Sequence, residues 1–243
     1  MAEAIPVPSK KLHGKVAIVT GAASGIGAVT TRHLADYRAR MVVIADVQDT
    51  KGREVAAAIG SDRCTYVHCD VTDEDQVKSL IDSTVGQYGQ LDVMFSNAGI
   101  IAEFAQTVLE LDFSRYDRVM AVNSRGMAAC VKHASCACDA SGVGAGEVSE
   151  HAAGGAWSAC DSVSPGMVGT QMVADTFKIG AEEVKEMLAA VYKGRDGPLM
   201  EKHVADTVVF LACEDSAFVT GHNLVVDGGV GTGMNIISAS KAN

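Results

Sequence analysis

The chain has 243 residues, of which 48% are hydrophobic and 21% are charged. This composition is enough for one sizeable core and excludes a disordered chain. Thirty acidic against twenty basic residues give a net charge of -10, and the densest basic run is Lys10 and Lys11. We therefore expect no nucleic-acid partner and no anionic membrane partner. No run approaches the ~18 to 20 apolar residues of a membrane span.

The seven cysteines, an odd number, argue against a secreted disulfide scaffold. The first residues hold prolines and a glutamate where a secretory leader needs a continuous apolar stretch. We therefore expect a cytoplasmic location. Four of the cysteines, together with His133 or His151, are numerous enough to supply the four ligands of a metal site. Their spacing lacks the paired C-x2-C of zinc sites, so no metal is expected. The four cysteines are Cys130, Cys136, Cys138 and Cys160.

The first part of the chain alternates short β-branched runs with longer amphipathic stretches. Such repeated β-α-β units predict a single α/β domain over residues 1–243 with a doubly wound, parallel, Rossmann-type sheet. Thr72 is predicted to cap the third helix. The predicted strands are 16–19, 41–44, 65–67 and 91–95, and the predicted helices are 26–36, 50–59, 73–88 and 113–133.

The pattern fails in a Gly/Ala/Ser/Cys-rich segment, residues 135–161, to which we assign no regular structure. We expect an interior strand of the sheet, the one beside 91–95, to be missing or disordered. The alternative is an improvised strand near Val143 or Glu147 and Val148. After this segment the pattern predicts strands at 162–164 and 223–227 and helices at 182–191 and 202–213.

A glycine-rich run follows the first predicted strand and opens a helix. Glycine backbone and the unpaired N–H groups of a helix N-terminus can hold a diphosphate there. The alternative is a turn that only packs the helix on the strand. The predicted binding residues are Gly21, Ser24, Gly25, Ile26 and Gly27.

Asp46 ends the second predicted strand, 19 residues after Gly27. A carboxylate at that place accepts hydrogen bonds from the adenosine-ribose hydroxyls and repels a 2′-phosphate, which favours NAD over NADP. The alternative is that Asp46 only caps the loop through Asp49. We place Asp46 and the adjacent Val47 at the cofactor.

These motifs, together with Cys69-Asp70-Val71 and Ser96-Asn97-Ala98-Gly99, resemble the short-chain dehydrogenase/reductase family, and in particular its plant NAD-dependent alcohol dehydrogenases of the secoisolariciresinol dehydrogenase and tasselseed type. The resemblance covers most of the chain. It implies that Asp70 and Val71 hold the adenine and that the segment from Asn97 lies against the cofactor. The other cofactor residues it implies are Ala98, Gly99, Pro165, Gly166, Val168 and Thr170.

The resemblance also identifies Asn123 as the helix asparagine that supports a proton-relay water, the one catalytic position matched here. Family members use a tyrosine as acid/base and a lysine four residues later, whose charge lowers the tyrosine pKa. In this chain, no tyrosine has a lysine at that spacing. Between Asn123 and Pro165 the family needs on the order of 60 residues or more, and this segment is too short. We expect the catalytic helix to be missing or disordered.

Three hypotheses follow. By family, the chain is an NAD-dependent oxidoreductase that interconverts a secondary alcohol and a ketone, with catalysis impaired in this chain. Alternatively, it is a non-catalytic NAD-binding protein or a partner of intact paralogues. The third hypothesis is that residues 135–161 are a splice or frameshift product of an active dehydrogenase. Rescue by Ser149, His151, Lys132 or His133 has no mechanistic logic. The expected assembly is at most a homodimer. Residues 171–197 are expected to form a lid over the substrate. The apolar lid residues favour an apolar alcohol as the substrate, or they form the core of the lid itself; they are Met172, Val173, Phe177, Met187 and Leu188.

Overall fold

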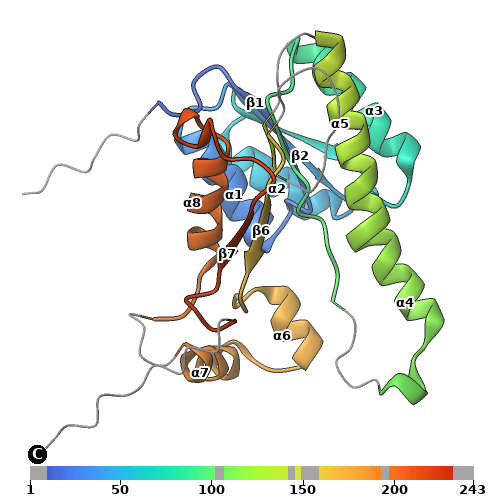
Figure 1. Ribbon diagram of the computed structural model, residues 1–243, viewed down its shortest axis with the longest axis vertical. Helices are drawn as coiled ribbons and strands as arrows, with labels where there is room; N and C mark the ends of the chain where they lie inside the picture. The colour runs from blue at the N-terminus through green and yellow to red at the C-terminus, as the bar shows by residue number, and fades with distance from the viewer. Residues whose placement is uncertain (1–9, 102–106, 142–145, 149–158, 193–196, 232–243) are drawn as a thin grey trace, which may run out of the picture.

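The computed structural model describes residues 10–101, 107–141, 146–148, 159–192 and 197–231. A five-stranded parallel sheet with the order β3-β2-β1-β4-β5 forms its centre, and helices cover both faces (Figure 1). The predicted Rossmann-type α/β fold is confirmed. The strands of this sheet are β1 (Val16–Thr20), β2 (Met41–Asp46), β3 (Cys64–His68), β4 (Val93–Phe95) and β5 (Gly146–Val148).

The two central strands are buried on both faces, which is why they read as continuous apolar runs. All residues of β1 and β2 are buried, and the strands pair in parallel from Val16 beside Met41 to Thr20 beside Ala45. On one face lie α1 (Gly25–Asp36), α2 (Asp49–Ile59) and α8 (Glu201–Leu211), and on the other lie α3 (Glu74–Tyr88) and α5 (Met127–Ser141).

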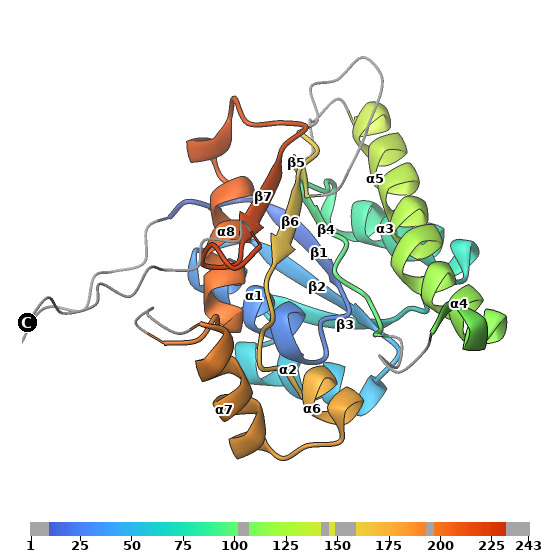
Figure 2. The same cartoon turned by 60° about the horizontal axis from the view of Figure 1, so that its bottom comes forward.

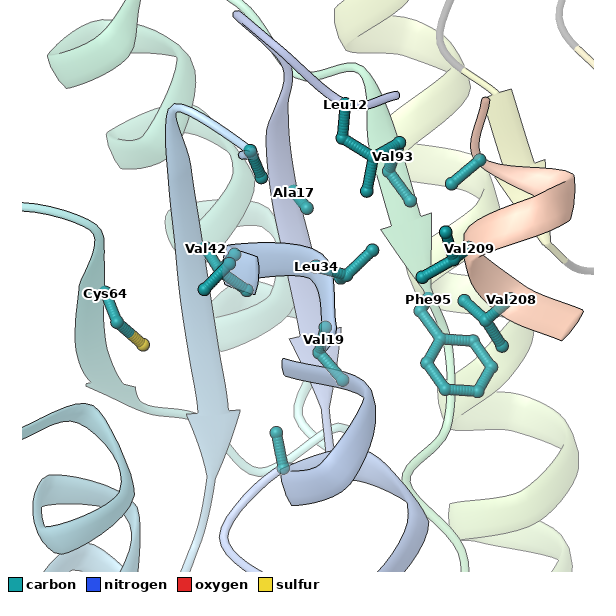
Figure 3. Packing of buried hydrophobic residues seen from close by; sticks show 14 of the residues in the cluster. Leu12, Ala17, Val19, Leu34, Val42, Cys64, Val93, Phe95, Val208 and Val209 are labelled. Carbon is teal, nitrogen blue, oxygen red and sulfur yellow. The ribbon is translucent and has the colours of Figure 1, made fainter. Parts of the chain in front are cut away.

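A core of aliphatic side chains joins α1 and α8 to the sheet. Leu34 of α1 is fully buried between Val19 and Val42 of the strands and Val208 and Val209 of α8 (Figure 3). Complete burial of a side chain of this size is worth about 1.5 to 3 kcal/mol. This packing fixes the N-terminus of α1 at the carboxyl edge of the sheet.

Two local predictions need correction on the face that carries α3. Asp73, not Thr72, caps α3, and its carboxylate accepts hydrogen bonds from the N–H groups of Asp75 and Gln76. The predicted helix 113–133 is longer and is interrupted. It consists of α4 (Phe113–Met120), a π-helical segment (Ala121–Gly126) that carries Asn123, and α5, which continues to Ser141.

The expectation that no strand lies beside 91–95 is wrong. Gly146–Val148 pairs in parallel with Val93–Phe95, in the improvised position near Glu147 and Val148. The segment 135–161 therefore contains regular structure in α5 and β5. The apolar pattern missed β5 because a three-residue strand is too short to show periodicity.

A second, two-stranded parallel sheet consists of β6 (Ser162–Pro165) and β7 (Asn223–Val226). Next to it lie α6 (Gln171–Phe177), which the sequence pattern missed, and α7 (Ala181–Val191) (Figure 2). Their shared core includes Val168, Val173, Val184, Leu188 and Tyr192. None of the helices in the described ranges is both long and apolar enough to cross a membrane.

Candidate functional site

A cleft of about 980 Å³ opens at the carboxyl ends of β1, β2 and β4. β1 lies between β2 and β4, so the chain connections diverge at this edge, which is where open parallel sheets bind ligands. Most predicted cofactor residues line it. These are Gly21, Ser24, Gly25, Ile26, Asp46, Val47, Asp70, Val71, Asn97, Ala98, Gly99, Pro165 and Thr170.

Glycine is required at two positions, one in the turn after β1 and one in the first turn of α1, for different reasons. Gly21 has a φ of +64, and a Cβ atom there would lie 2.7 Å from the Ala98 Cα atom. A Cβ on Gly27 would lie 2.4 Å from the Gly21 carbonyl oxygen. Gly27 therefore packs helix against strand and does not line the cleft. The motif therefore serves both predicted roles: Gly21 lines the cleft, and Gly27 allows the helix to pack closely on the strand.

No side chain of α1 itself caps its N-terminus or places a negative charge there. Ser24 stands at the cap position but makes no side-chain capping hydrogen bond, and the first turn holds no acidic residue. In contrast, α3 has the Asp73 cap and two acidic residues, Glu74 and Asp75, in its first turn. The exposed N–H groups and helix dipole of α1 suit an external anion such as a diphosphate.

Asn97 fastens the glycine turn to the end of β4. Its side-chain Nδ2 donates to the carbonyl oxygens of Thr20 at 2.9 Å and Gly21 at 3.2 Å. The Thr20 hydroxyl accepts from the backbone N–H groups of Asn97 at 3.0 Å and Ala98 at 3.1 Å. Sequence reasoning missed Thr20, although a polar residue at the end of a wholly apolar strand is a usable signal.

Asp46 is buried at the end of β2 and faces the cleft. One carboxylate oxygen accepts from the N–H of Ala23 and the other from the N–H of Gln48, both at 2.9 Å. The carboxylate therefore joins the glycine turn to the β2–α2 loop, as the capping alternative predicted. Each oxygen keeps a free lone pair, so a ribose hydroxyl can still donate to it.

The other adenosine-side residues lie beyond Asp46 along the sheet edge. Val71 is buried against the π-helical segment, where a Cβ on Gly126 would come within 2.8 Å of it. The Asp70 carboxylate accepts from the N–H and hydroxyl of Thr72 at 2.9 and 2.8 Å. Val47 is 55% exposed and lines the cleft. An apolar surface and a fixed carboxylate together suit a purine ring and its polar edge.

The segment after β6 closes the other end of the cleft. Pro165 and Thr170 line it, whereas Gly166 and Val168 do not. Val168 is buried in the core under α6 and α7. Of the apolar residues of the lid, Met172 lines the cleft and Leu188 lies in that same core. Met172 is therefore placed to contact a substrate, whereas Leu188 packs inside the lid.

Asn123 lies outside the cleft lining and is exposed. Its Oδ1 accepts from the N–H of Ile100 and its Nδ2 donates to the carbonyl oxygen of Ile100, both at 2.9 Å. Both functional groups of this side chain therefore hold the chain after Gly99. In this arrangement Asn123 fixes the backbone beside the cofactor segment, and its carbonyl oxygen keeps one lone pair for a water molecule.

Neither tyrosine nor lysine occurs among the described residues that line the cleft. The titratable side chains there are Asp46, Cys69, Asp70 and Arg118. Burial raises the pKa of the Cys69 thiol to about 12, which makes it a poor nucleophile. Arg118 of α4, missed by sequence reasoning, has no periodic or motif signal. Thus no acid/base pair of the family's kind lies among these residues.

Two of the side chains weighed as replacements, Lys132 and His133, are engaged elsewhere. Glu74 accepts from Lys132 Nζ at 2.6 Å and lies 3.1 Å from His133 Nε2, on the outer face between α3 and α5. Ser149, His151 and Trp157 lie outside the described residues. No cluster of metal-ligating side chains forms in the ranges the structure describes.

Comparison with known proteins identifies relatives over nearly the whole chain. Residues 15–145 match the short chain dehydrogenase family and residues 151–231 match the enoyl-(acyl carrier protein) reductase family. A (-)-isopiperitenol/(-)-carveol dehydrogenase of Mentha piperita, named as mitochondrial, is 45% identical, with 91% of this chain and 95% of the relative covered. A (+)-cis,cis-nepetalactol synthase of Nepeta racemosa is 44% identical, with 91% and 93% covered.

A relative named short-chain dehydrogenase reductase 3b, from Arabidopsis thaliana, is 40% identical over 90% of this chain and 96% of its own. The crystal structure of a short-chain type dehydrogenase/reductase from Mycobacterium marinum superposes with a TM-score of 0.79. It covers 91% of this chain and 97% of that one, at 24% identity. At this identity, the superposition supports the fold alone.

Proposed function

Because the chain belongs to the short-chain dehydrogenase/reductase family, whose members are oxidoreductases that use NAD or NADP, we propose that it binds NAD and is impaired in hydride transfer. The observation that carries the proposal is that most residues predicted to hold the adenosine and the diphosphate line one cleft, whereas the described lining of that cleft holds neither tyrosine nor lysine. On this proposal, the chain binds the cofactor without efficient turnover of a substrate.

The residues present fit the dinucleotide. The uncapped N-terminus of α1 and the glycine turn would hold the diphosphate, and the lone pairs left on Asp46 would accept the ribose hydroxyls. When bound, NAD supplies the hydride acceptor of an alcohol oxidation. Preference for NAD over NADP rests on the buried position of Asp46 and its orientation toward the cleft. Coulomb repulsion there disfavours a 2′-phosphate.

The lengths in the comparison agree with a shorter chain than in the Mentha piperita relative. The alignment with the Mentha piperita relative is 251 positions long and includes 91% of this chain. That fraction is about 221 of 243 residues, so about 30 positions of the alignment have no residue from this chain. Only 13 residues separate Val148 of β5 from Ser162 of β6. A splice or frameshift origin of 135–161 agrees with these numbers, and sequencing the transcript tests it.

The substrate end of the cleft favours an apolar alcohol or ketone. Ile100, Ile101, Val122 and Met172 line it. The two relatives from Mentha and Nepeta are named for carveol, isopiperitenol and nepetalactol. We infer that any residual activity acts on a cyclic, apolar secondary alcohol of that kind.

The direct test measures cofactor binding and turnover on the same preparation. We expect measurable NAD affinity by calorimetry and NADH formation at background with carveol as the substrate. The Mentha piperita relative, assayed in parallel, is the positive control. Robust turnover by this chain would refute the impairment, and absence of NAD binding would refute the function as a whole.

A second candidate is a non-catalytic partner for another copy or for an intact paralogue. Large apolar side chains before and along α4 are exposed, with Leu109 at 93%, Phe113 at 69% and Tyr116 at 47%. Exposed apolar patches on this scale mark contact surfaces. Co-expression with an intact paralogue, followed by affinity purification, tests this role.

We also propose a cytoplasmic location. One relative carries the word mitochondrial in its name, so the compartment of this chain has to be tested directly. Imaging of the chain with a C-terminal fluorescent tag would do so, and accumulation in mitochondria would contradict the proposal.

A further inference from the structure

Tyr66 lies on β3, the strand that pairs with β2, whose last residue is Asp46. Its hydroxyl lies 2.7 Å from the carbonyl oxygen of Asp46 and 2.8 Å from Oδ1 of Asp49, and its single proton is shared between these two acceptors. The first acceptor belongs to the residue whose carboxylate faces the ribose site. The second stands at the start of α2. One phenol therefore joins the end of β2 to the first turn of the next helix.

The ring of Tyr66 is held by the helix it faces. A Cβ atom on Gly52 would lie 2.3 Å from two of the ring carbons, so the ring lies directly on the backbone of α2. The guanidinium of Arg53 lies over the ring, 5.5 Å from its centroid. With the ring fixed on both sides, the position of the hydroxyl is set by packing and not by the hydrogen bonds alone.

Asp49 is itself fixed, which makes it a stable acceptor. Its carboxylate lies 2.6 Å from His68 Nδ1 and 3.2 Å from Arg53 Nη2. The hydrogen bond with His68, followed by that with Tyr66, lowers the pKa of Asp49. Asp49 therefore stays ionised at neutral pH and keeps its hydrogen bond with the phenol.

We propose that Tyr66 is a positioning residue for cofactor selection: it holds the backbone of Asp46 so that the carboxylate points at the ribose site. The inference rests on the proposed NAD preference and deepens it. Without the hydroxyl, the Asp46 carbonyl loses its side-chain tether. The end of β2 can then shift and carry the carboxylate of Asp46 away from the ribose, which weakens ribose binding and relieves the repulsion of a 2′-phosphate.

The test uses ligands that occupy only the adenosine half of the cleft, ADP-ribose and 2′-phospho-ADP-ribose, titrated by calorimetry. Tyr66→Phe keeps the ring on Gly52 and removes one oxygen. We expect it to lower the affinity ratio of the two ligands roughly 3- to 10-fold, the range of one hydrogen bond. Gly52→Ala displaces the ring instead and should lower the ratio in the same direction.

The matched control is Tyr88→Phe, because the Tyr88 hydroxyl makes no hydrogen bond within the described part of the chain. It should leave the ratio within 2-fold of wild type. Melting temperatures of all variants report their folding. A purely structural role would weaken both ligands equally and leave their ratio unchanged, and that result would overturn the inference.

Asp46→Ala separates the inference from the function it rests on. If Asp46→Ala lowers the ratio and neither Tyr66→Phe nor Gly52→Ala does, Tyr66 does not position the carboxylate and the NAD preference stands. If wild type shows no preference for ADP-ribose, both proposals fail. A lower ratio in Tyr66→Phe with an unchanged ratio in Tyr88→Phe supports the inference.

Discussion

The Thr20 hydroxyl at the end of β1 accepts a 3.0 Å hydrogen bond from the backbone N–H of Asn97 at the end of β4. The same oxygen accepts from Ala98, and Thr20 is fully buried. A single side chain thus satisfies two N–H groups where the two strands diverge to form the cleft. Loss of this acceptor removes the hydrogen bond that each of these two N–H groups makes with the Thr20 side chain.

Thr20→Val should therefore lower the free energy of unfolding by about 1 to 3 kcal/mol, because an isosteric methyl replaces the hydroxyl. Thr20→Ser, which keeps the oxygen, is the matched control and should lose less. Denaturant titration measures both. Equal destabilisation of the two variants would show that the methyl packing of Thr20, and not its oxygen, matters.

Asp46→Ala should weaken NAD by about 2 to 3 kcal/mol and NADP by less, because the ribose loses its acceptor while a 2′-phosphate loses a repulsive charge. Asp36→Ala is a suitable control, since Asp36 is exposed at the end of α1. Calorimetric titration of both cofactors gives the two affinities. Equal or tighter NADP binding by the wild type would remove Asp46 from the site.

The ion pairs of Glu74 predict a pH-dependent contribution to stability. Hydrogen bonds from Lys132 and then His133 lower the pKa of Glu74 below its usual 4.5. A lowered pKa stabilises the fold above the unfolded pKa, and this stabilisation is lost as pH falls through the folded value.

Glu74→Gln should thus lower the melting temperature at pH 7 and have a smaller effect at pH 3.5. Glu54→Gln, at an exposed position of α2, is the control and should show no such trend. A constant difference between Glu74→Gln and wild type at both pH values would contradict the assignment.

We expect a dimer at most. If the Tyr/Lys helix is missing, as the sequence pattern predicts, the contact that family members make partly through that helix is lost, and the face of α8 and β7 remains. On that side Phe218 and Val225 are exposed, at 103% and 55%. Sedimentation velocity should show monomer and dimer, and Phe218→Ser should shift the distribution to monomer. A stable tetramer would contradict this prediction.

The cofactor half of the molecule could be predicted from sequence because its signals are local. β1 and β2 are buried on both faces and so appear as apolar runs, and the glycine turn follows directly from β1. Asp46 ends β2 as expected, although its hydrogen bonds to Ala23 and Gln48 became visible only in three dimensions.

The other half depends on tertiary contacts that leave no periodic pattern. β5 has three residues and exists through its pairing with β4. The predicted cap of α3 is Thr72, and the observed cap is Asp73. These adjacent residues both have a high N-cap preference, so residue preferences alone cannot decide between them. Arg118 reaches the cleft because of the course of α4, and no sequence spacing encodes that.

The division into two sheets has a consequence for local opening. In the described part of the chain β6 and β7 pair with each other and not with β5, so this unit can separate from the five-stranded sheet without breaking a ladder hydrogen bond between them. A dinucleotide in the cleft would contact Gly21 and Asn97 on one side and Val163 and Pro165 on the other. A bound dinucleotide would therefore hold the two sheets together where their described strands share no cross-strand hydrogen bonds. Amide exchange in β6 and β7 should slow sharply when NAD is added. Exchange in β1 and β2, which are already paired within the five-stranded sheet, should change little.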